Sequence, residues 1–188
     1  IARARGVTSG PVIVDGSKED GVESLLKACR KLTEVHGPIN KAHGKLFWFE
    51  GGDFTDWVSP PAVGPDGFVT APGTFSADGI DPASALLAEA LPRTIGAHVV
   101  DLGAGWGYLS SHVLDRPDVT RIDLVEAEHA ALDCARRNVG DPRALFHWAD
   151  ATKWTPDTKA DAVVMNPPFH TGRKAQPDLG LAFIRAAA

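Results

Sequence analysis

From residue 81 to residue 165, segments with apolar residues at helical spacing alternate with short apolar runs typical of strands. Asp81 and Pro82 are typical of a helix start, because an Asp caps the first turn and a Pro fits its first position, and Pro92 ends the helix. The apolar face of this helix would comprise Leu86, Leu87, Ala90 and Leu91. Further along, the pattern predicts strands at 98–102, 121–125, 144–147 and 162–165, and helices at 108–114 and 128–138.

Strands that alternate with helices form a parallel sheet covered by helices on both faces, and fully apolar strands suit that burial. We therefore predict that residues 74–188 form a doubly wound, Rossmann-like α/β domain. Such sheets bind ligands beyond the carboxyl ends of their strands, where the strand order reverses. The four predicted strand ends carry the segment 101–107, Glu126, Asp150 and the segment 166–169.

The first 58 residues follow a different pattern. They predict a strand at 12–15, an amphipathic helix at 19–32 and a strand at 46–49, which together are a fragment of a second α/β domain. The apolar face of the helix would comprise Val22, Leu25, Leu26 and Cys29. Between Gly51 and Gly73 the composition changes to Gly, Pro and Asp, which are turn residues. We therefore place a domain boundary there and expect residues 59–73 to be a linker.

The composition is that of a globular protein, since 44% of the 188 residues are hydrophobic and 23% are charged. No apolar run has the length of a membrane span and the first residues lack a signal-peptide core, so we expect a cytoplasmic protein without a membrane partner. Cys29 and Cys134 lack the spacing of a zinc site, which predicts buried thiols and no metal. The net charge of −5 disfavours a surface that grips nucleic acid throughout, so an RNA site would be a local patch.

The segment 101–107, Asp-Leu-Gly-Ala-Gly-Trp-Gly, connects a predicted strand to a predicted helix. Its glycines permit positive φ and let a ligand approach the backbone, although a tight connection is the alternative explanation. Asp101 would repel a pyrophosphate and attract the ammonium of an amino acid. Tyr108 stands where a dinucleotide fingerprint has its third Gly. The loop therefore indicates S-adenosylmethionine rather than NAD. We assign Gly103, Ala104 and Gly105 to cofactor binding together with Asp101.

Two acidic residues at later strand ends extend the predicted cofactor site. Glu126 ends the second strand and would accept hydrogen bonds from both ribose hydroxyls, with a solvated strand-end charge as the alternative. Asp150 follows the third strand, where a carboxylate can accept a hydrogen bond from the adenine amino group, unless it is a simple turn residue. The adjoining Ala127 and Ala151 complete these assigned contacts.

The segment Asn166-Pro-Pro-Phe169 indicates a planar amino group as the acceptor of a methyl group, although a strand-terminating turn is the alternative. Prolines have no N–H, so the loop offers carbonyls but no donors at 167 and 168. The Asn166 side-chain oxygen and the Pro167 carbonyl would accept the two amine hydrogens, orient the nitrogen and stabilise its developing charge without a metal. Asn166 would also border the cofactor. Phe169 would stack on a base, and His170 is either a phosphate or base contact or a partly exposed loop residue.

On these two loops the chain resembles the ribosomal RNA small subunit methyltransferase C family, which methylates guanine N2 in small-subunit rRNA. The resemblance includes the lead-in Pro72-Gly-Thr-Phe-Ser-Ala-Asp-Gly-Ile-Asp81, and it implies that Phe75 closes over the cofactor and shapes the acceptor pocket. It further implies that residues 1–58 end an N-terminal methyltransferase-like domain that no longer binds cofactor. The basic stretch Lys41–Lys45 there would contact RNA phosphate or form a solvated turn. Because family members carry further elements, we expect both ends of this sequence to be trimmed.

The resemblance implies an enzyme that transfers a methyl group from S-adenosylmethionine to guanine N2 of 16S rRNA in the 30S subunit, with the base turned out of its stack. Adenine N6 and a protein glutamine amide are alternative acceptors, because each presents a planar nitrogen with two hydrogens. A non-catalytic RNA-binding module on the same scaffold is a third reading. Intact Asp101, Glu126 and Asn166 favour an enzyme over that module.

Overall fold

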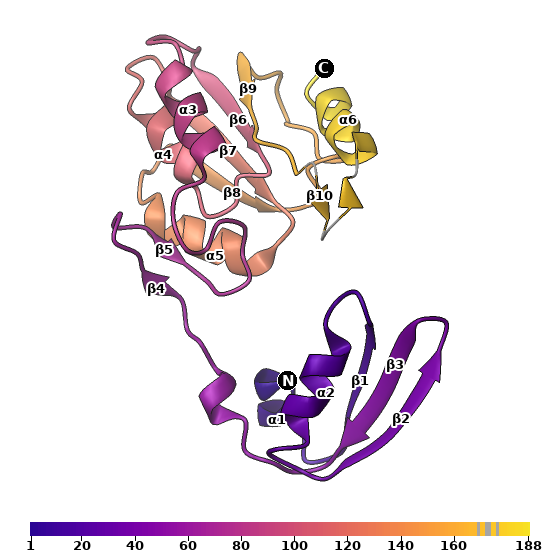
Figure 1. Cartoon of the computed structure of the whole chain (residues 1–188). Helices are drawn as coiled ribbons and strands as arrows, with labels where there is room; N and C mark the ends of the chain where they lie inside the picture. Colours follow the sequence, from indigo (N-terminus) through magenta and orange to yellow (C-terminus); the bar gives the residue numbers. More distant parts are fainter. Residues whose placement is uncertain (169, 172–173, 176) are drawn as a thin grey trace. The chain divides into compact units, whose positions relative to one another are not determined.

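The computed structural model describes residues 1–168, 170–171, 174–175 and 177–188. The chain divides into two compact units, residues 1–59 and residues 60–188 (Figure 1). Each unit buries its own cluster of apolar side chains. Cys29 is buried in the first unit and Cys134 in the second, and both are free thiols, as the sequence predicts.

The N-terminal unit is a three-stranded antiparallel sheet with a helix packed on one face. Its elements are α1 (Ala2–Val7), β1 (Val12–Ser17), α2 (Val22–Cys29), β2 (Val35–Lys41), β3 (Gly44–Phe49) and the 3-10 helix η1 (Thr55–Trp57). Strand β3 lies between β1 and β2. Val22, Leu26 and Cys29 of α2 are buried with Phe47 and Phe49 of β3, which confirms the predicted apolar face of the helix.

Two features of this unit differ from the expectation. Helix α2 is shorter than the predicted 19–32, because Gly21 in the left-handed conformation precedes it and the residues after Cys29 form turns. The sequence pattern does not predict β2, since most of its side chains are exposed and show no apolar alternation. The basic stretch Lys41–Lys45 spans the end of β2, the turn and the start of β3, and Lys45 makes an ion pair of 2.6 Å with Glu23.

The C-terminal unit is a doubly wound α/β domain, which confirms the predicted fold class. Its elements are β4 (Ala62–Val63), β5 (Val69–Thr70), α3 (Pro82–Ala90), β6 (His98–Leu102), α4 (Tyr108–Leu114), β7 (Arg121–Glu126), α5 (His129–Asn138), β8 (Ala144–Trp148), β9 (Ala162–Val164), β10 (His170–Thr171), β11 (Lys174–Ala175) and α6 (Pro177–Ala186). Strands β6 to β9 form a parallel sheet in the order β8-β7-β6-β9. The strand order therefore reverses between β6 and β9.

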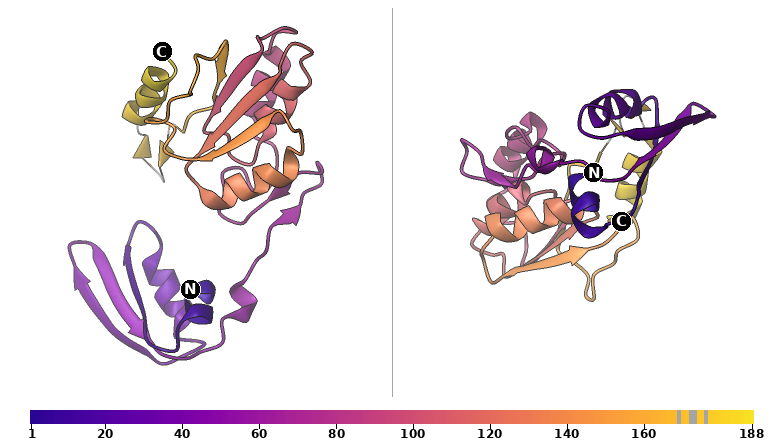
Figure 2. Two further views of the ribbon diagram at one scale, coloured as in Figure 1. Left: turned by 180° about the vertical axis from the view of Figure 1, so that it is seen from behind. Right: turned by 90° about the horizontal axis from the view of Figure 1, so that it is seen from below.

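Helices cover both faces of this sheet (Figure 2). On one face, α4 and α5 pack against Ile122 and Leu124. On the other face, Phe183 of α6 packs with Val100 and Val125. Successive residues of a strand point to opposite faces, so a strand buried on both sides must be apolar at consecutive positions. That requirement is why the continuous apolar runs identify these strands correctly.

Helix α3 begins where the sequence predicts it, but it buries only part of the predicted face. The Asp81 carboxylate accepts a hydrogen bond from the Ser84 amide at 2.7 Å and so caps the helix. The buried side chains of the helix are those of Ser84 and Ala88, whereas Leu86 is 67% exposed. The predicted apolar face is therefore right only in part, since Leu91 packs against the core of the sheet domain while Leu86 and Ala90 are exposed. Small residues bring the start of α3 close to the sheet.

Residues 60–73, for which the turn residues predict a linker, belong to the C-terminal unit. They contain the antiparallel pair β4–β5. Asn138, the last residue of α5, accepts a hydrogen bond from the Val69 amide at 2.7 Å and donates one to the Val69 carbonyl at 2.8 Å. This pair of bonds fastens β5 to the sheet domain.

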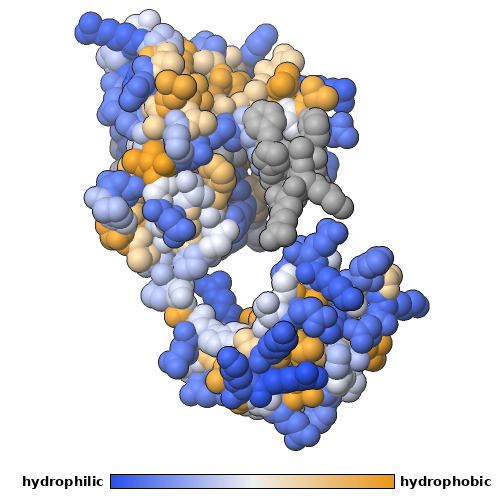
Figure 3. All heavy atoms as spheres, viewed as in Figure 1, coloured by the Kyte–Doolittle hydropathy of each residue, from blue (hydrophilic) through white to orange (hydrophobic). Residues whose placement is uncertain are grey.

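Hydrophobic residues are scattered among hydrophilic ones on the face of the protein seen in Figure 3. Exposed large apolar side chains such as Val7, Val63 and Trp148 belong to different elements. Within the described ranges, no helix has the length and apolar character needed to cross a membrane. In those same ranges, no three His, Cys, Asp or Glu side chains form a group that could hold a metal ion.

Candidate active site

A cavity of about 550 Å³ lies at the carboxyl ends of the parallel strands, within the range of about 300–1,000 Å³ typical of small-molecule sites. Nine of the residues assigned from the sequence line it, namely Phe75, Gly103, Gly105, Glu126, Ala127, Asp150, Ala151, Asn166 and Pro167. Pro168 of the predicted acceptor loop also lines the cavity. The other lining residues, to which the sequence prediction gives no role in the site, are Asp81, Ala83, Glu128, Ala131, Thr152, Leu179 and Phe183.

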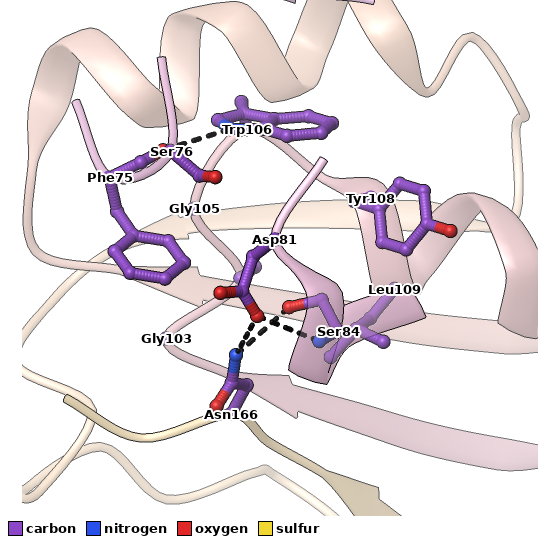
Figure 4. A pocket seen from close by; sticks show the side chains of 11 residues that line it. Phe75, Ser76, Asp81, Ser84, Gly103, Gly105, Trp106, Tyr108, Leu109 and Asn166 are labelled. Atoms are coloured by element: carbon purple, nitrogen blue, oxygen red, sulfur yellow. Dashed lines mark hydrogen bonds between the residues drawn. The ribbon is translucent and has the colours of Figure 1, made fainter. Parts of the chain in front are cut away.

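The remaining assigned residues lie elsewhere. Ala104 lines a smaller pocket, which shares Phe75, Gly105 and Asn166 with the large cavity (Figure 4). Asp101 is fully buried at the end of β6. The residue at 169 and the side chain at 170 are outside the described residues, so the predicted contacts of Phe169 and His170 with a base stay predictions.

Gly105 and Gly107 serve different purposes in the loop after β6. Gly105 has a φ of 56°, and nothing lies within 4 Å of the position that a Cβ would take, so its backbone is open to a ligand. Gly107 has a φ of 90°, and a Cβ there would lie 2.8 Å from Val139 Cγ2 and 3.3 Å from Ala135 Cβ. The absence of a side chain at Gly107 therefore allows α4 and α5 to pack closely.

Asp101 is a buried carboxyl with one unpaired oxygen. Its Oδ2 accepts a hydrogen bond from the Ser110 hydroxyl at 2.7 Å, while its Oδ1 has no partner among the described residues. Burial raises the pKa of Asp101 to about 7; the Ser110 bond opposes this rise and the charge of Glu126 adds to it. A buried oxygen of this kind favours a cationic partner, because an unpaired charge in a poorly solvated place is costly.

Glu126 is held at the end of β7 by two backbone amides. Its Oε2 accepts a hydrogen bond from the Gly105 amide at 2.8 Å, and its Oε1 accepts one from the Glu128 amide at 2.7 Å. Each oxygen keeps a second lone pair. The carboxylate therefore ties the glycine loop to β7 and can still accept hydrogen bonds from a ligand. Burial raises the pKa of the neighbouring Glu128, which also lines the cavity.

Asp150 is bound by residues that follow it in the chain. Its Oδ1 accepts hydrogen bonds from the Thr152 hydroxyl at 2.6 Å and the Thr152 amide at 3.0 Å, and its Oδ2 lies 2.9 Å from Lys153 Nζ. The Thr152 hydroxyl and Lys153 lower the pKa of Asp150 to about 2. Asp150 is therefore an ionised acceptor on the cavity wall at neutral pH.

Asn166 is connected to the start of α3. Its Nδ2 donates hydrogen bonds to Asp81 Oδ2 at 3.0 Å and to Ser84 Oγ at 2.9 Å (Figure 4). The side-chain oxygen of Asn166 points away from these two residues (Figure 4). The adjoining Pro167 also lines the cavity. The sequence identifies Asn166, but it does not identify Asp81 and Ser84 as its partners.

The lead-in segment is fastened to the glycine loop by Trp106. The indole Nε1 of Trp106 donates a hydrogen bond to the Phe75 carbonyl at 3.0 Å. Trp106 is buried, and its ring packs against Phe68 and Tyr108 with ring centroids 5.1 Å and 5.7 Å away. The Phe75 side chain is 62% exposed and lines the cavity. A tryptophan among the loop glycines is the sequence signal that could have suggested this anchor.

The family model of the methyltransferase small domain matches residues 66–188, which is more than half of the chain. The chain belongs to this family. Curated relatives include the ribosomal RNA small subunit methyltransferase C of Salmonella paratyphi B and that of Salmonella newport. Each is 27% identical over 187 residues, which cover 94% of this chain and 53% of the relative. The chain thus spans about half the length of the curated relatives it matches.

A similar solved structure agrees with the family match. The T. thermophilus 16S rRNA N2 G1207 methyltransferase (RsmC), in complex with AdoMet and guanosine, is 25% identical to this chain with a TM-score of 0.70. The match covers 96% of this chain and 53% of that one. Together with the family match, it confirms the resemblance read from the sequence and the Rossmann-like fold of class I S-adenosylmethionine-dependent methyltransferases.

Proposed function

We propose that this chain carries the active site of an S-adenosylmethionine-dependent enzyme that methylates the exocyclic N2 amine of a guanine in 16S rRNA. The observation that carries the proposal is the arrangement of Asn166. Because Asp81 and Ser84 take both hydrogens of its amide nitrogen, its oxygen is left to accept a hydrogen from an amine. The similar T. thermophilus methyltransferase, described with AdoMet and guanosine, supports guanine as the acceptor.

The residues around the cavity fit S-adenosylmethionine chemically. The free lone pairs of Glu126 would accept hydrogen bonds from the ribose hydroxyls, and Asp150 would accept one from the adenine amine. Asp101 is buried and does not line the cavity, but the charge of its unpaired oxygen would favour the ammonium of the methionine part. Ala127 and Ala151 offer apolar wall to the adenine ring. When bound, the cofactor supplies an electrophilic methyl group on a positively charged sulfur.

The acceptor side of the site would act by orientation and by charge stabilisation. Asn166 Oδ1 and the Pro167 carbonyl accept the two hydrogens of the amine, which directs the nitrogen lone pair toward the methyl group. As the new N–C bond would form and the bond from the methyl group to sulfur would break, with its electron pair left on the sulfur, the nitrogen would gain positive charge, which the two fixed oxygens would stabilise. The methylated amine then loses one proton to solvent.

We also infer that residues 1–58 are the end of a non-catalytic methyltransferase-like domain. Residues 59–73, which belong to the C-terminal unit from residue 60 on, would connect it to the catalytic residues at 74–188. Support comes from the curated relatives, whose match extends over 94% of this chain and so includes both units. The 30S subunit is the proposed partner. The Lys41–Lys45 turn would add positive charge toward RNA, although Glu23 offsets the charge of Lys45.

Methyl transfer from labelled S-adenosylmethionine tests the proposal directly. The full chain is incubated separately with 30S subunits, free 16S rRNA, DNA and protein, and the products are digested to nucleosides or amino acids. We expect label in N2-methylguanosine. Label in N6-methyladenosine or in glutamine would replace guanine as the acceptor. Cofactor binding in calorimetry without transfer to any substrate would favour a non-catalytic RNA-binding module.

A further inference from the structure

We propose that Asp81 and Ser84 are positioning residues that hold the Asn166 carboxamide in one orientation and so decide which substrate atom the site accepts. This inference rests on the proposed function, because it concerns how Asn166 is prepared for the acceptor amine. From the sequence, Asp81 is a helix cap at the end of the lead-in segment, and nothing is assigned to Ser84.

The contacts form a closed arrangement at the start of α3. Asp81 Oδ2 accepts hydrogen bonds from the Ser84 amide at 2.7 Å and from Asn166 Nδ2 at 3.0 Å. Ser84 Oγ accepts the second Asn166 hydrogen at 2.9 Å, and the Ser84 side chain is buried. Helix capping therefore fixes the carboxylate, and the fixed carboxylate in turn fixes Asn166 (Figure 4).

The reverse orientation of the carboxamide is unfavourable. An ionised carboxylate can only accept hydrogen bonds, so rotating Asn166 by half a turn would bring its Oδ1 against Asp81 Oδ2. Two acceptors would then face each other, and both hydrogen bonds to Nδ2 would be lost. Bonds to a charged partner are stronger than neutral ones, which increases the preference. Asn166 therefore offers an acceptor to the cavity, and not a donor.

This orientation selects between groups on a base. Guanine offers its N2 amine as a donor, while its O6 and N7 are acceptors. An Asn166 fixed with Oδ1 toward the cavity accepts the amine and repels O6 or N7 from the same position. The bond to the Asp81 charge also polarises the carboxamide, which makes Oδ1 a better acceptor as the substrate nitrogen becomes positive. Asp81 and Ser84 would thus act through Asn166 on the rate of transfer, and not on cofactor affinity.

Two substitutions of Asp81 at the helix cap distinguish a role in positioning Asn166 from a role in the stability of the fold. Asp81→Ser keeps a good cap, but its side chain is one bond shorter and loses the contact with Asn166. Asp81→Asn keeps both the cap and an acceptor, but it loses the charge. We expect Asp81→Ser to lower kcat about 10- to 100-fold, with cofactor Kd and thermal stability near those of the wild type. The kcat of Asp81→Asn should fall between those of Asp81→Ser and the wild type. Glu89→Gln, which removes a charge from an exposed position of the same helix, is the matched control and should keep the wild-type kcat.

A second measurement does not depend on activity. In an NMR spectrum of the full chain, the Asn166 side-chain NH₂ signals, assigned by their loss in Asn166→Ala, should exchange slowly with solvent in the wild type and quickly in Asp81→Ser. Fast exchange in the wild type, or an Asp81→Ser variant with unchanged kcat and stability, would overturn the proposal. Absence of methyl transfer by the wild type, with slow Asn166 exchange intact, would instead contradict the proposed function alone.

Discussion

Replacing the buried Asp101 by Asn should change how the stability of the C-terminal unit depends on pH. Burial raises the pKa of Asp101 from the ordinary 3.8 to about 7, so between these values the folded chain holds a proton that the unfolded chain has lost. Stability therefore falls as the pH rises through this interval, by about 1.4 kcal/mol for each pH unit. From pH 5 to pH 8 the wild type should lose about 2–3 kcal/mol through this one group.

The carboxamide introduced by Asp101→Asn does not titrate. The free energy of unfolding of this variant minus that of the wild type should therefore rise by about 2–3 kcal/mol between pH 5 and pH 8. Urea denaturation at several pH values measures this difference, in which the contributions of all other groups cancel. Asp118→Asn is the control. Two backbone amides lower the pKa of Asp118, so its carboxyl is ionised in the folded and the unfolded chain above pH 5. The free energy of unfolding of this variant minus that of the wild type should therefore stay constant. A difference for Asp101→Asn that is equally flat would refute the reasoning.

Three further substitutions test the site. Asn166→Ala should keep cofactor binding in calorimetry yet lower kcat at least about 100-fold, since it removes a fixed acceptor; retained transfer would exclude that role. In Glu126→Gln, the side chain has one acceptor oxygen and cannot accept hydrogen bonds from both the Gly105 and Glu128 amides, so the cofactor Kd should rise about 10- to 100-fold. An unchanged Kd would count against a role of Glu126 in cofactor binding. Gly107→Ala should lower the free energy of unfolding, measured in urea, by about 2–4 kcal/mol, because φ at this position is positive and the new Cβ would clash with Val139. A loss below about 1 kcal/mol would contradict this prediction.

The sequence alone predicts much of the sheet domain. Strand β6 and helix α4 have the predicted bounds, and the other strands of this sheet differ by one residue at one end. Strands buried on both faces must be apolar at successive positions, so their pattern is strong and local. Strand β2 has mostly exposed side chains and leaves no such pattern, which is why it is found only through its pairing with β3.

The site also has residues that the sequence predicts and contacts that only the structure shows. Residues that follow a strand can be located from the strand itself, so the sequence alone assigns Gly105, Glu126 and Asn166 to one edge of the sheet. The contact of Asn166 with Asp81 joins positions 85 residues apart and leaves no trace in either local pattern. The same holds for Phe183, which reaches the cavity from α6.

Local sequence thus determined which chemical groups this protein brings to the carboxyl edge of its sheet, because strand and turn preferences act over a few residues. Only the tertiary structure decided how those groups face one another: that Asp101 is buried with one oxygen unpaired among the described residues, and that Asn166 turns its oxygen away from the helix cap. Orientation and burial depend on neighbours that folding brings from distant parts of the chain, and no local pattern records them.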